Sequence, residues 1–530
     1  MTETTTASTD LTPAGINAAF SVPDSGDAPA AVYMIRGGWA VQYDAASTAP
    51  PRRGTTLREL WPQLPATYLG GVDATCSTDT QRVYFFKGST CVLYDIAKNE
   101  PVGGAAPVQI GDKFPGLRNG APDFTQGVDA GMAASDGTVY LFRGGQFVNY
   151  DLDGDEVLEQ GTLEKDWANA SYPDSEVYGG VVAAFNHPAT RNGYLVAPGG
   201  TRSVECDTDP DAHRVTSGAK ALRDRWLHRT FLSVLDGSDG RLWVFDADSG
   251  QRIRQSQVGV EPGGVVISPD GFRTLSTAKG DGGGEGNLAL LDITAGTLRT
   301  VGAGVWPYRV TVLPDGSAAY VTNPLAGTAH AIDLTTGAAR SIDVGPSPDG
   351  IVASPEGDRV YVATDGDPVV AVVDPTTNTV GRRFGGPITA MCTALTPDGN
   401  TLCFGIHSGV NAVAVAMTAG AGDPPLVPVG QSPEQLAPSP DAAFVYVANR
   451  GHEIKVIDVQ AVREVTPVRT PRDRTNAVAV SPDGGFLFVT SERADSVQKL
   501  PVNGGDPVAE FPLGAALGNN AYLAIGPAWG

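Results

Sequence analysis

The sequence predicts an all-β protein made of two β-propellers in tandem, a four-bladed one followed by a seven-bladed one that is closed by pairing of its own two ends. Two repeats predict this: one recurs every 53 to 56 residues before residue 226, and another recurs every 41 to 45 residues after residue 229. Glycine (66) and proline (40) are abundant in the 530 residues, which favours turns over long helices. We divide the chain into a disordered leader (1–11), a four-bladed propeller (12–226) and a seven-bladed propeller (227–530).

The first repeat has four steps, and each step is explained by strand and turn chemistry. It opens with a short apolar strand, at 16–20, 72–76, 128–132 and 181–185. An aromatic strand ending in a glycine turn follows, written VYMIRGG, VYFFKGS, VYLFRGG and GYLVAPGG. A third strand ends at Asp44, Asp95, Asp151 or Asp207, and an aromatic marker comes after it at Trp61, Phe114, Trp167 or Trp226. Alternating strands separated by glycine turns at this period predict one propeller blade per repeat.

This pattern resembles the hemopexin-like repeat, with its aspartate–alanine opening, Tyr/Phe-rich second strand, basic-Gly turn, Tyr-Asp and tryptophan-containing tail. The resemblance covers about residues 12–226 and supplies the four units that close one hemopexin-like propeller. Asn17 and Val182 stand where the family prefers aspartate, and no cysteine near residue 16 is available to clasp the first blade to the fourth. We therefore expect closure by packing and strand pairing alone.

The second repeat is marked by a Pro-Asp/Glu turn that joins two antiparallel strands. Its prolines are Pro269, Pro314, Pro355, Pro397, Pro440 and Pro482. Proline fixes φ at the second turn position, the acidic side chain caps the turn, and glycine takes the positive φ. The strands around these turns resemble the YVTN family of seven-bladed propellers, named for a tetrapeptide present here from Tyr320 to Asn323.

Six such turns provide six inner strands, and the seventh is expected at the C-terminus, over 521–526. The segment 229–258 has the outer three strands of a blade but no inner one. The two segments should complete one blade between them, which removes an open sheet edge. Between the propellers, Ser217 is a candidate N-cap, and a helix is expected over 217–227.

Charge and cysteine content exclude several classes of partner and framework. The net charge of −22 repels phosphate backbones and anionic lipid, so we expect neither nucleic acid nor a membrane as partner. No apolar run reaches the roughly 18 residues that a spanning helix needs. The start has no signal-peptide pattern, so a cytoplasmic location is expected, with export by another route left open. Five cysteines without metal-ligand spacing predict no disulfide framework or zinc site.

The hemopexin-like resemblance implies Ca²⁺ or Na⁺, with chloride, in the four-bladed tunnel. Backbone carbonyls of the opening strands would form two rings there, and such oxygens suit hard cations. The first ring comprises Asn17, Asp73, Asp129 and Val182, and the second Ala19, Thr75, Gly131 and Ala184. The alternative is a tunnel that holds only water. An ion there would staple blades together rather than catalyse a reaction.

Haem is a further possibility raised by the resemblance, because hemopexin holds it with histidines between two four-bladed propellers. His213 and His228 lie near the expected linker. The second propeller here resembles another family, so that geometry does not transfer, and haem binding is not expected.

No nucleophile elbow, zinc-protease motif or P-loop occurs in the sequence. Propellers bind ligands at the loops that lead into their inner strands. At that mouth of the second propeller we expect the ligand-binding residues Tyr308, Arg309, Asp349, Glu434, Arg472 and Asn476. The alternative is an ordinary solvated rim.

We therefore expect a non-catalytic binding protein, a monomer, whose mouth loops bind a protein, a glycan or a small molecule. The rival is an enzyme of lyase, cyclase or isomerase type, with its site at the seven-blade mouth or between the propellers. A third interpretation is metal or haem binding in the hemopexin manner.

Overall fold

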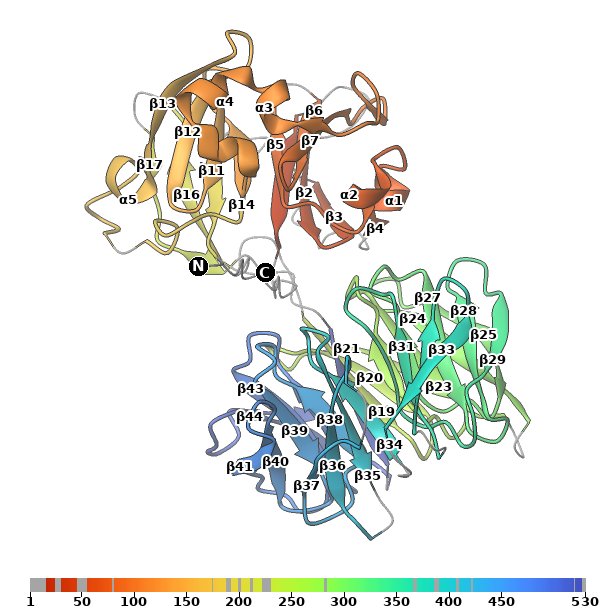
Figure 1. Cartoon of the computed structure of the whole chain (residues 1–530). Coiled ribbons are helices and arrows are strands. Elements are labelled where there is room, and N and C mark those ends of the chain that lie inside the picture. The colour runs from red at the N-terminus through yellow and green to blue at the C-terminus, as the bar shows by residue number, and fades with distance from the viewer. Residues whose placement is uncertain are drawn as a thin grey trace, which may run out of the picture. The chain divides into compact units, whose positions relative to one another are not determined.

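The computed structural model describes residues 16–526, apart from 24–29, 45–54, 79–80, 174, 187–191, 199–201, 210–212, 222–229, 281–283, 366–368, 386–389, 407–408, 421–422 and 519. These residues form two compact all-β units, within 16–221 and 230–526 (Figure 1). Both units consist of small antiparallel sheets, which confirms the expected tandem β-propellers. No helix among the described residues is long and apolar enough to cross a membrane.

The described part of the first unit contains four sheets that follow one another along the chain. The first has β1 (Ala18–Val22), β2 (Ala31–Arg36), β3 (Trp39–Asp44) and β4 (Thr55–Thr56). The second has β5 (Ala74–Ser77), β6 (Arg82–Lys87), β7 (Thr90–Asp95) and β8 (Glu100–Pro101), with β9 (Val108–Gln109) also on β7. The third has β10 (Ala130–Ala133), β11 (Val139–Arg143), β12 (Gln146–Asp151) and β13 (Glu156–Thr162). The fourth has β14 (Ala183–Asn186), β15 (Gly193–Val196), β16 (Arg202–Asp207) and β17 (Arg214–Val215), with β18 (Lys220–Ala221) also on β16.

The inner strands of this unit close into a ring, in which β1 contacts β5, β5 contacts β10, β10 contacts β14, and β14 contacts β1. The aromatic markers of the repeat fill the wedges between neighbouring sheets. Trp61 is 3% exposed, and its ring centroid lies 5.5 Å from that of Phe20 in the first sheet and 5.1 Å from that of Phe85 in the second. Large buried aromatic rings of this kind contribute much of the packing free energy. Trp226 lies outside the described residues.

The repeated acidic opening and basic-Gly turn have a shared structural role. The Asp73 carboxylate accepts a 2.6 Å hydrogen bond from the Gly88 amide, and Asp129 accepts the same bond from Gly144. Gly88 has a φ of +54°, in the left-handed region that favours glycine. In the second and third blades the basic residue before the turn donates to a carbonyl ahead of its own blade: Lys87 Nζ to Gly71 and Arg143 Nη1 to Gly127, both at 2.6 Å. These hydrogen bonds therefore hold the turn after the second strand against the residues that begin the blade.

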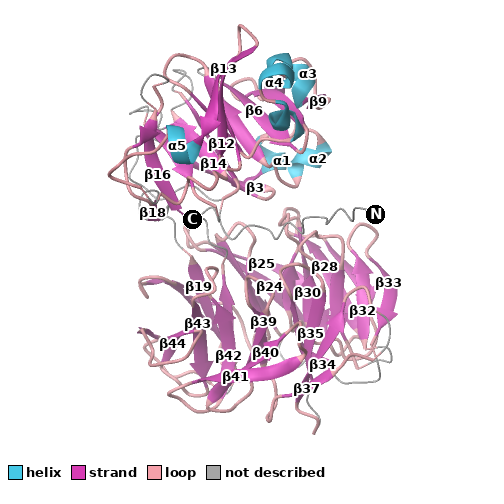
Figure 2. Cartoon of the chain, turned by 60° about the vertical axis from the view of Figure 1, so that its left-hand side comes forward, coloured by secondary structure: helices cyan, strands magenta, loops and turns pink. Residues whose placement is uncertain are grey.

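Short helices connect the sheets of this unit (Figure 2), and the sequence interpretation missed them. They are α1 (Leu57–Leu60), α2 (Ala66–Leu69), α3 (Ile110–Lys113), α4 (Pro115–Gly120), the 3₁₀ helix η1 (Pro122–Gln126) and α5 (Leu163–Asp166). The signal for α1 was present, because Thr56 and Glu59 form a capping box.

The helix expected over 217–227 is wrong where the structure describes it. Lys220–Ala221 form β18, which pairs with β16, and residues 222–227 lie outside the described residues. The Ser217 hydroxyl accepts a 2.8 Å hydrogen bond from the Glu205 amide, so the proposed cap serves a sheet edge instead.

The second unit contains seven four-stranded sheets within its described residues. The first joins β19 (Phe231–Asp236), β20 (Arg241–Asp246) and β21 (Arg252–Gln257) to β46 (Ala521–Ile525). The next three are β22 (Val265–Ile267), β23 (Arg273–Ala278), β24 (Glu285–Asp292) and β25 (Leu298–Val305); β26 (Val310–Val312), β27 (Ala318–Asn323), β28 (Thr328–Asp333) and β29 (Ala339–Asp343); and β30 (Ile351–Ala353), β31 (Val360–Ala363), β32 (Val370–Asp374) and β33 (Thr379–Phe384). The last three are β34 (Ala390–Leu395), β35 (Thr401–Ile406), β36 (Ala412–Met417) and β37 (Leu426–Pro428); β38 (Gln435–Pro438), β39 (Phe444–Ala448), β40 (Glu453–Asp458) and β41 (Arg463–Arg469); and β42 (Thr475–Val480), β43 (Phe486–Ser491), β44 (Ser496–Pro501) and β45 (Ala509–Pro512).

The chain end closes this unit as the sequence predicts. Strand β46 pairs antiparallel with β19, with Val234 opposite Leu523, and the inner strands contact one another in a ring from β22 through β42 to β46. Leu523 is 2% exposed and belongs to the apolar cluster between this sheet and the β42–β45 sheet. The closing strand thus covers a sheet edge and fills a core.

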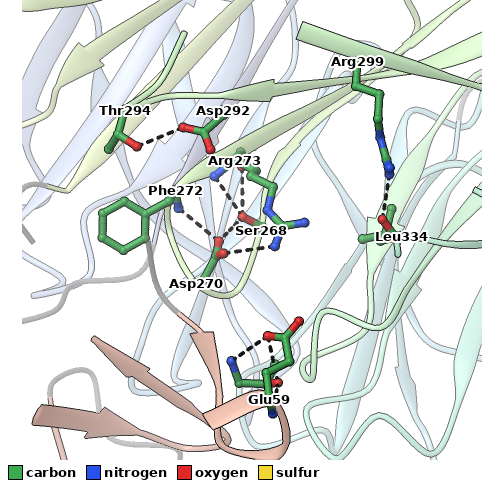
Figure 3. Close-up of polar contacts among 10 residues, drawn as sticks. Glu59, Ser268, Asp270, Phe272, Arg273, Asp292, Thr294, Arg299 and Leu334 are labelled. Carbon is green, nitrogen blue, oxygen red and sulfur yellow. Dashed lines mark hydrogen bonds and ion pairs between the residues drawn. The ribbon is translucent and has the colours of Figure 1, made fainter. Parts of the chain in front are cut away.

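The recurring proline turn is held by its own polar side chains (Figure 3). Asp270 is fully buried, accepts hydrogen bonds from the Ser268 hydroxyl and the Phe272 amide, and lies 3.5 Å from the Arg273 guanidinium. Acidic capping of this kind is what the turn residues predict. It sets the start of each second strand, and therefore the register of the sheet.

Candidate functional site at the mouth of the second unit

The loops that lead into the inner strands of the second unit carry strained backbone. Trp306, just before β26, has a φ of +55°, and Glu261, before β22, has a φ of +42°. A bulky residue in the left-handed region is an outlier that costs free energy. Such strain persists where the surrounding structure fixes it, and it concentrates at functional sites. The strained backbone therefore marks these loops as a candidate functional site.

An ion pair lies at the centre of this mouth. Arg309, before β26, places its Nε 3.4 Å from Oδ1 of Asp349, before β30. The two side chains are only 18% and 14% exposed. Burial raises the pKa of Asp349 to about 7, although Arg309 beside it lowers this pKa. A carboxyl group that titrates near neutral pH in a cleft is a candidate functional group.

Two tyrosine rings enclose the Arg309 guanidinium. Its central carbon lies 4.9 Å from the ring centroid of Tyr308 and 4.8 Å from that of Tyr522, on the closing strand β46. The cation is attracted by the faces of both rings, and its planar group stacks well on them. The Nη groups of Arg309 form no hydrogen bond with any described residue, so they remain available as donors.

A second cation lies beside this cluster. Lys279 Nζ is 4.1 Å from the ring centroid of Trp306 and 5.1 Å from that of Tyr308, and the two rings are stacked with their planes 11° apart. Burial lowers the pKa of Lys279, while the carboxylates of Glu261 and Asp349 oppose that shift. The strained backbone at Trp306 thus places an aromatic face under an ammonium group.

A small polar cavity opens next to Arg309. It holds about 370 Å³, part of it open to solvent. Its lining comprises Tyr308, Arg309, Met391, Pro433, Glu434, Asn476, Asn520, Ala521 and Tyr522. Asn476 is 4% exposed; its Oδ1 accepts a 2.8 Å hydrogen bond from Thr490, and its Nδ2 has no partner among the described residues. A buried donor left unpaired is costly unless a water or ligand satisfies it.

Glu434 supplies the carboxylate of this cavity and belongs to an ion-pair network. It lies 2.8 Å from Arg450, which is 3.9 Å from Glu492, and Glu492 in turn lies 2.8 Å from Arg474. The network fixes the Glu434 side chain at the wall of the cavity, where it remains 19% exposed.

The structure thus brings five of the six residues expected at the mouth to one place: Tyr308, Arg309, Asp349, Glu434 and Asn476. Arg472 is directed elsewhere, because its guanidinium lies 3.1 Å from Asp495 and 3.3 Å from Glu510. Sequence reasoning missed Lys279 and Tyr522. Tyr522 lay in the predicted closing strand, and its place in that strand was the available signal.

The expected second ring lies on the inner strands β1, β5, β10 and β14, and each residue of the first ring comes just before one of these strands. The carboxylates of Asp73 and Asp129 are used by turn amides, and the Thr75 hydroxyl donates a 2.8 Å hydrogen bond to the Ala19 carbonyl. Gly131 is required by close packing, since a Cβ there would lie 2.6 Å from Cβ of Cys76. A cation in this tunnel would have uncharged carbonyl oxygens as its protein ligands, and the Ala19 carbonyl among them already accepts the Thr75 hydroxyl. The metal site stays a prediction.

The histidines considered for haem have other surroundings where they are described. His213 packs against Tyr140, Phe147 and Trp167, and its Nδ1 lies 3.2 Å from the Tyr140 hydroxyl. His228 lies outside the described residues.

No family model and no curated protein matches the chain. Solved structures that are similar to it include a hydrazine synthase of Kuenenia stuttgartiensis (19% identity, TM-score 0.44, 49% of this chain and 89% of that one) and the hemopexin fold protein CP4 from cow pea (22%, 0.35, 40% and 95%). A third is the Swd1 β-propeller domain of Myceliophteria thermophila (17%, 0.42, 49% and 90%). At these identities and scores, the similarities say nothing about what this chain binds.

Proposed function

We propose that the protein binds a small polar ligand at the mouth of its second unit. The observation that carries this proposal is the convergence on one cavity of Arg309, Glu434, Asn476 and Tyr522, which come from four different sheets. A few placed polar groups beside aromatic walls are typical of small-molecule sites.

The cavity chemistry defines the class of ligand. Arg309 and Asn476 offer donors, so the ligand presents an acceptor or anionic group to them. Glu434 accepts, so the same ligand presents a hydroxyl or amino donor on its other side. Only about 30 Å³ of this space is enclosed by the protein, so the cavity would take one polar end of a small molecule and not a folded protein.

A ligand screen with matched variants tests this function. Metabolites carrying both an anionic group and a donor are screened by their effect on thermal unfolding of the full chain, and those that stabilise it are titrated calorimetrically. Asn476→Ala and Glu434→Gln should each weaken binding at least tenfold. Arg472→Gln is the control, because that side chain points to Asp495 and Glu510, and it should bind like the wild type. Equal affinity in all four proteins, or no stabilising ligand, would contradict the proposal.

A second candidate function is acid–base catalysis, which the pKa of Asp349, raised to about 7 by burial, favours. A group that titrates near the working pH can accept and return a proton efficiently. Arg309 would orient the carboxylate and a bound anion together. Ligands from the screen are followed by NMR for conversion; Asp349→Asn should abolish any turnover and leave affinity within a few-fold. Turnover that survives Asp349→Asn would exclude this role.

We also propose the finer family assignments: hemopexin-like for the first unit and YVTN-like for the second. They are supported by the repeated acidic opening with its basic-Gly turn, and by the Pro-Asp turns with the tetrapeptide from Tyr320 to Asn323.

A further inference from the structure

A second hollow of the same unit is a groove between two neighbouring sheets, and it shares no lining residue with the mouth cavity. It lies between the sheet β34–β37 and the sheet β38–β41 and holds about 1650 Å³, part of it open to solvent. Its walls contain the end of β36 on one side, and on the other the Pro-Asp turn before β39 and the turn between β40 and β41. We call it the inter-blade groove.

The β36 wall is apolar and incompletely covered. The outer strand β37 pairs with Ala412, Val413 and Ala414, and the Val415 amide donates a 3.0 Å hydrogen bond to the Pro425 carbonyl just before that strand. Among the described residues, only the end of β36 at Ala416 and Met417 has no outer strand beside it. Met417 at its end is 58% exposed, although methionine is an apolar side chain suited to adaptable contacts. The exposed Met417 side chain is therefore the apolar surface that this wall offers.

The opposite wall carries two apolar side chains at positions where the repeat uses glycine. Ala442 has a φ of +61° and Val462 a φ of +50°. The matching Pro-Asp turns elsewhere have Gly271, Gly316, Gly357, Gly399 and Gly484, and the matching β-turns have Gly250, Gly296, Gly337 and Asn378. A β-branched residue in the left-handed region is a clear outlier. Both apolar exceptions fall in one blade, and both line this groove.

The rim of the groove is acidic. Asp398, Asp423, Asp441 and Asp458 line it, and none of them forms an ion pair with a cation among the described residues. Asp441 caps its turn by accepting from the Ala443 amide at 3.1 Å, and Asp458 accepts from the Ala461 amide at 2.8 Å. The nearby cation Arg382 donates to the carbonyls of Thr418 and Gly420 and holds the loop after β36.

We propose that the inter-blade groove docks an extended segment of a protein partner in which apolar residues alternate with lysine or arginine. The apolar side chains would lie on Met417, Ala442 and Val462, and the cations would meet the rim carboxylates. The Val462 side chain also packs against the apolar cluster of these two sheets, so it serves the core as well as the groove, whereas Ala442 belongs to no such cluster among the described residues. This surface is separate from the mouth and does not depend on its ligand.

A library of acetylated octapeptides, with every position varied, tests the proposal on the full chain. We expect selected peptides to combine lysine or arginine with leucine, valine or methionine. Their affinity should fall at least tenfold in the double variant Ala442→Gly with Val462→Gly. Ala442→Gly alone restores the residue of the matching Pro-Asp turns, so its thermal midpoint should stay equal or rise, and weaker binding by this single variant separates lost contact from lost fold. Val462→Gly also removes packing on the core.

Two double variants that each remove a pair of acidic charges complete the test. Asp441→Asn with Asp458→Asn keeps the turn-capping oxygen and should weaken binding at least tenfold, less so at high salt. Asp315→Asn with Asp333→Asn makes the same change at matching positions of the β26–β29 sheet and should bind like the wild type. The proposal is overturned if no such peptides are selected, if both double variants bind alike, or if the chain self-associates through this groove and Met417→Lys abolishes that association.

Discussion

The Arg309 guanidinium lies 3.4 Å from the Asp349 carboxylate, and both side chains are largely buried at the mouth of the second unit. Taking two charges out of water is expensive, and the pair repays this only in part. Tyr308 and Tyr522 enclose the cation. The loss of water around the Asp349 carboxylate outweighs the attraction of Arg309, so the pKa of Asp349 is raised.

The pKa of Asp349 predicts a pH dependence of stability. Its folded value of about 7 lies above the ordinary value near 4, so between these values the folded chain holds a proton that the unfolded chain has lost. The stabilisation that proton binding to Asp349 provides is fully present below about pH 4 and is lost as the pH rises through 7. The free energy of unfolding then falls by up to about 1.4 kcal/mol per pH unit. Calorimetry should show the free energy of unfolding of the second unit falling as the pH rises from 5 to 8. Asp349→Asn should make this free energy depend less on pH. An identical profile in both proteins would disprove the assignment.

Removal of residues 521–530 should unfold the second unit and spare the first. The deletion takes away β46, exposes the edge of β19, and breaks the contacts of Gln435, whose side chain donates to the Leu523 carbonyl at 2.7 Å. Losing buried Leu523 alone is comparable to a large-to-small core change of about 2–5 kcal/mol. Backbone amides should lose protection from hydrogen exchange over residues 230–520 only. Deletion of 527–530 is the control and should leave protection intact; loss of protection in the first unit as well would contradict independent closure.

Asp129→Ala should destabilise the first unit by about 1.5–3 kcal/mol, since it removes a charge-assisted hydrogen bond to the Gly144 amide. Asp129→Asn keeps an acceptor oxygen and should recover more than half of that loss. Urea unfolding of the first unit measures both. The explanation of the repeated motif fails if the two substitutions are equally harmful or equally mild.

Millimolar calcium should raise the unfolding midpoint of the first unit by a few degrees, and a chelator should reverse the shift, if the carbonyl rings hold a hard cation. Magnesium is the control ion, because its strict octahedral geometry and tightly held water make it a poor fit for rings of carbonyl ligands. Calorimetry with each ion provides the measurement. Equal shifts with both ions, or none with calcium, would count against the tunnel site.

The sheets were predictable from sequence because turn residues and the alternation of apolar and polar residues are set by neighbouring positions in the chain. The Pro-Asp turns and the glycine turns fix where each strand begins, and β46 was identified from the missing inner strand of the segment 229–258. The short helices were not predicted, since four residues carry too little periodicity; only the Thr56 and Glu59 capping box marked one of them.

The mouth was predictable as a place but not as a geometry. Loop position alone selected both Arg309 and Arg472, yet one guanidinium turns inward to Asp349 and the other outward to Asp495. Side-chain direction depends on which charges neighbouring blades present, and one blade's sequence does not contain that information. Tyr522 is a similar case, because its contact with Arg309 forms only when the ends of the ring meet.

Hydrogen exchange with and without the strongest ligand from the screen tests the central claim most directly. The binding account predicts new protection confined to the loops around Tyr308, Glu434 and Asn476 and to the start of β46. Protection that appears instead on the Pro-Asp turns, or on the first unit, would show that the mouth is not the ligand site.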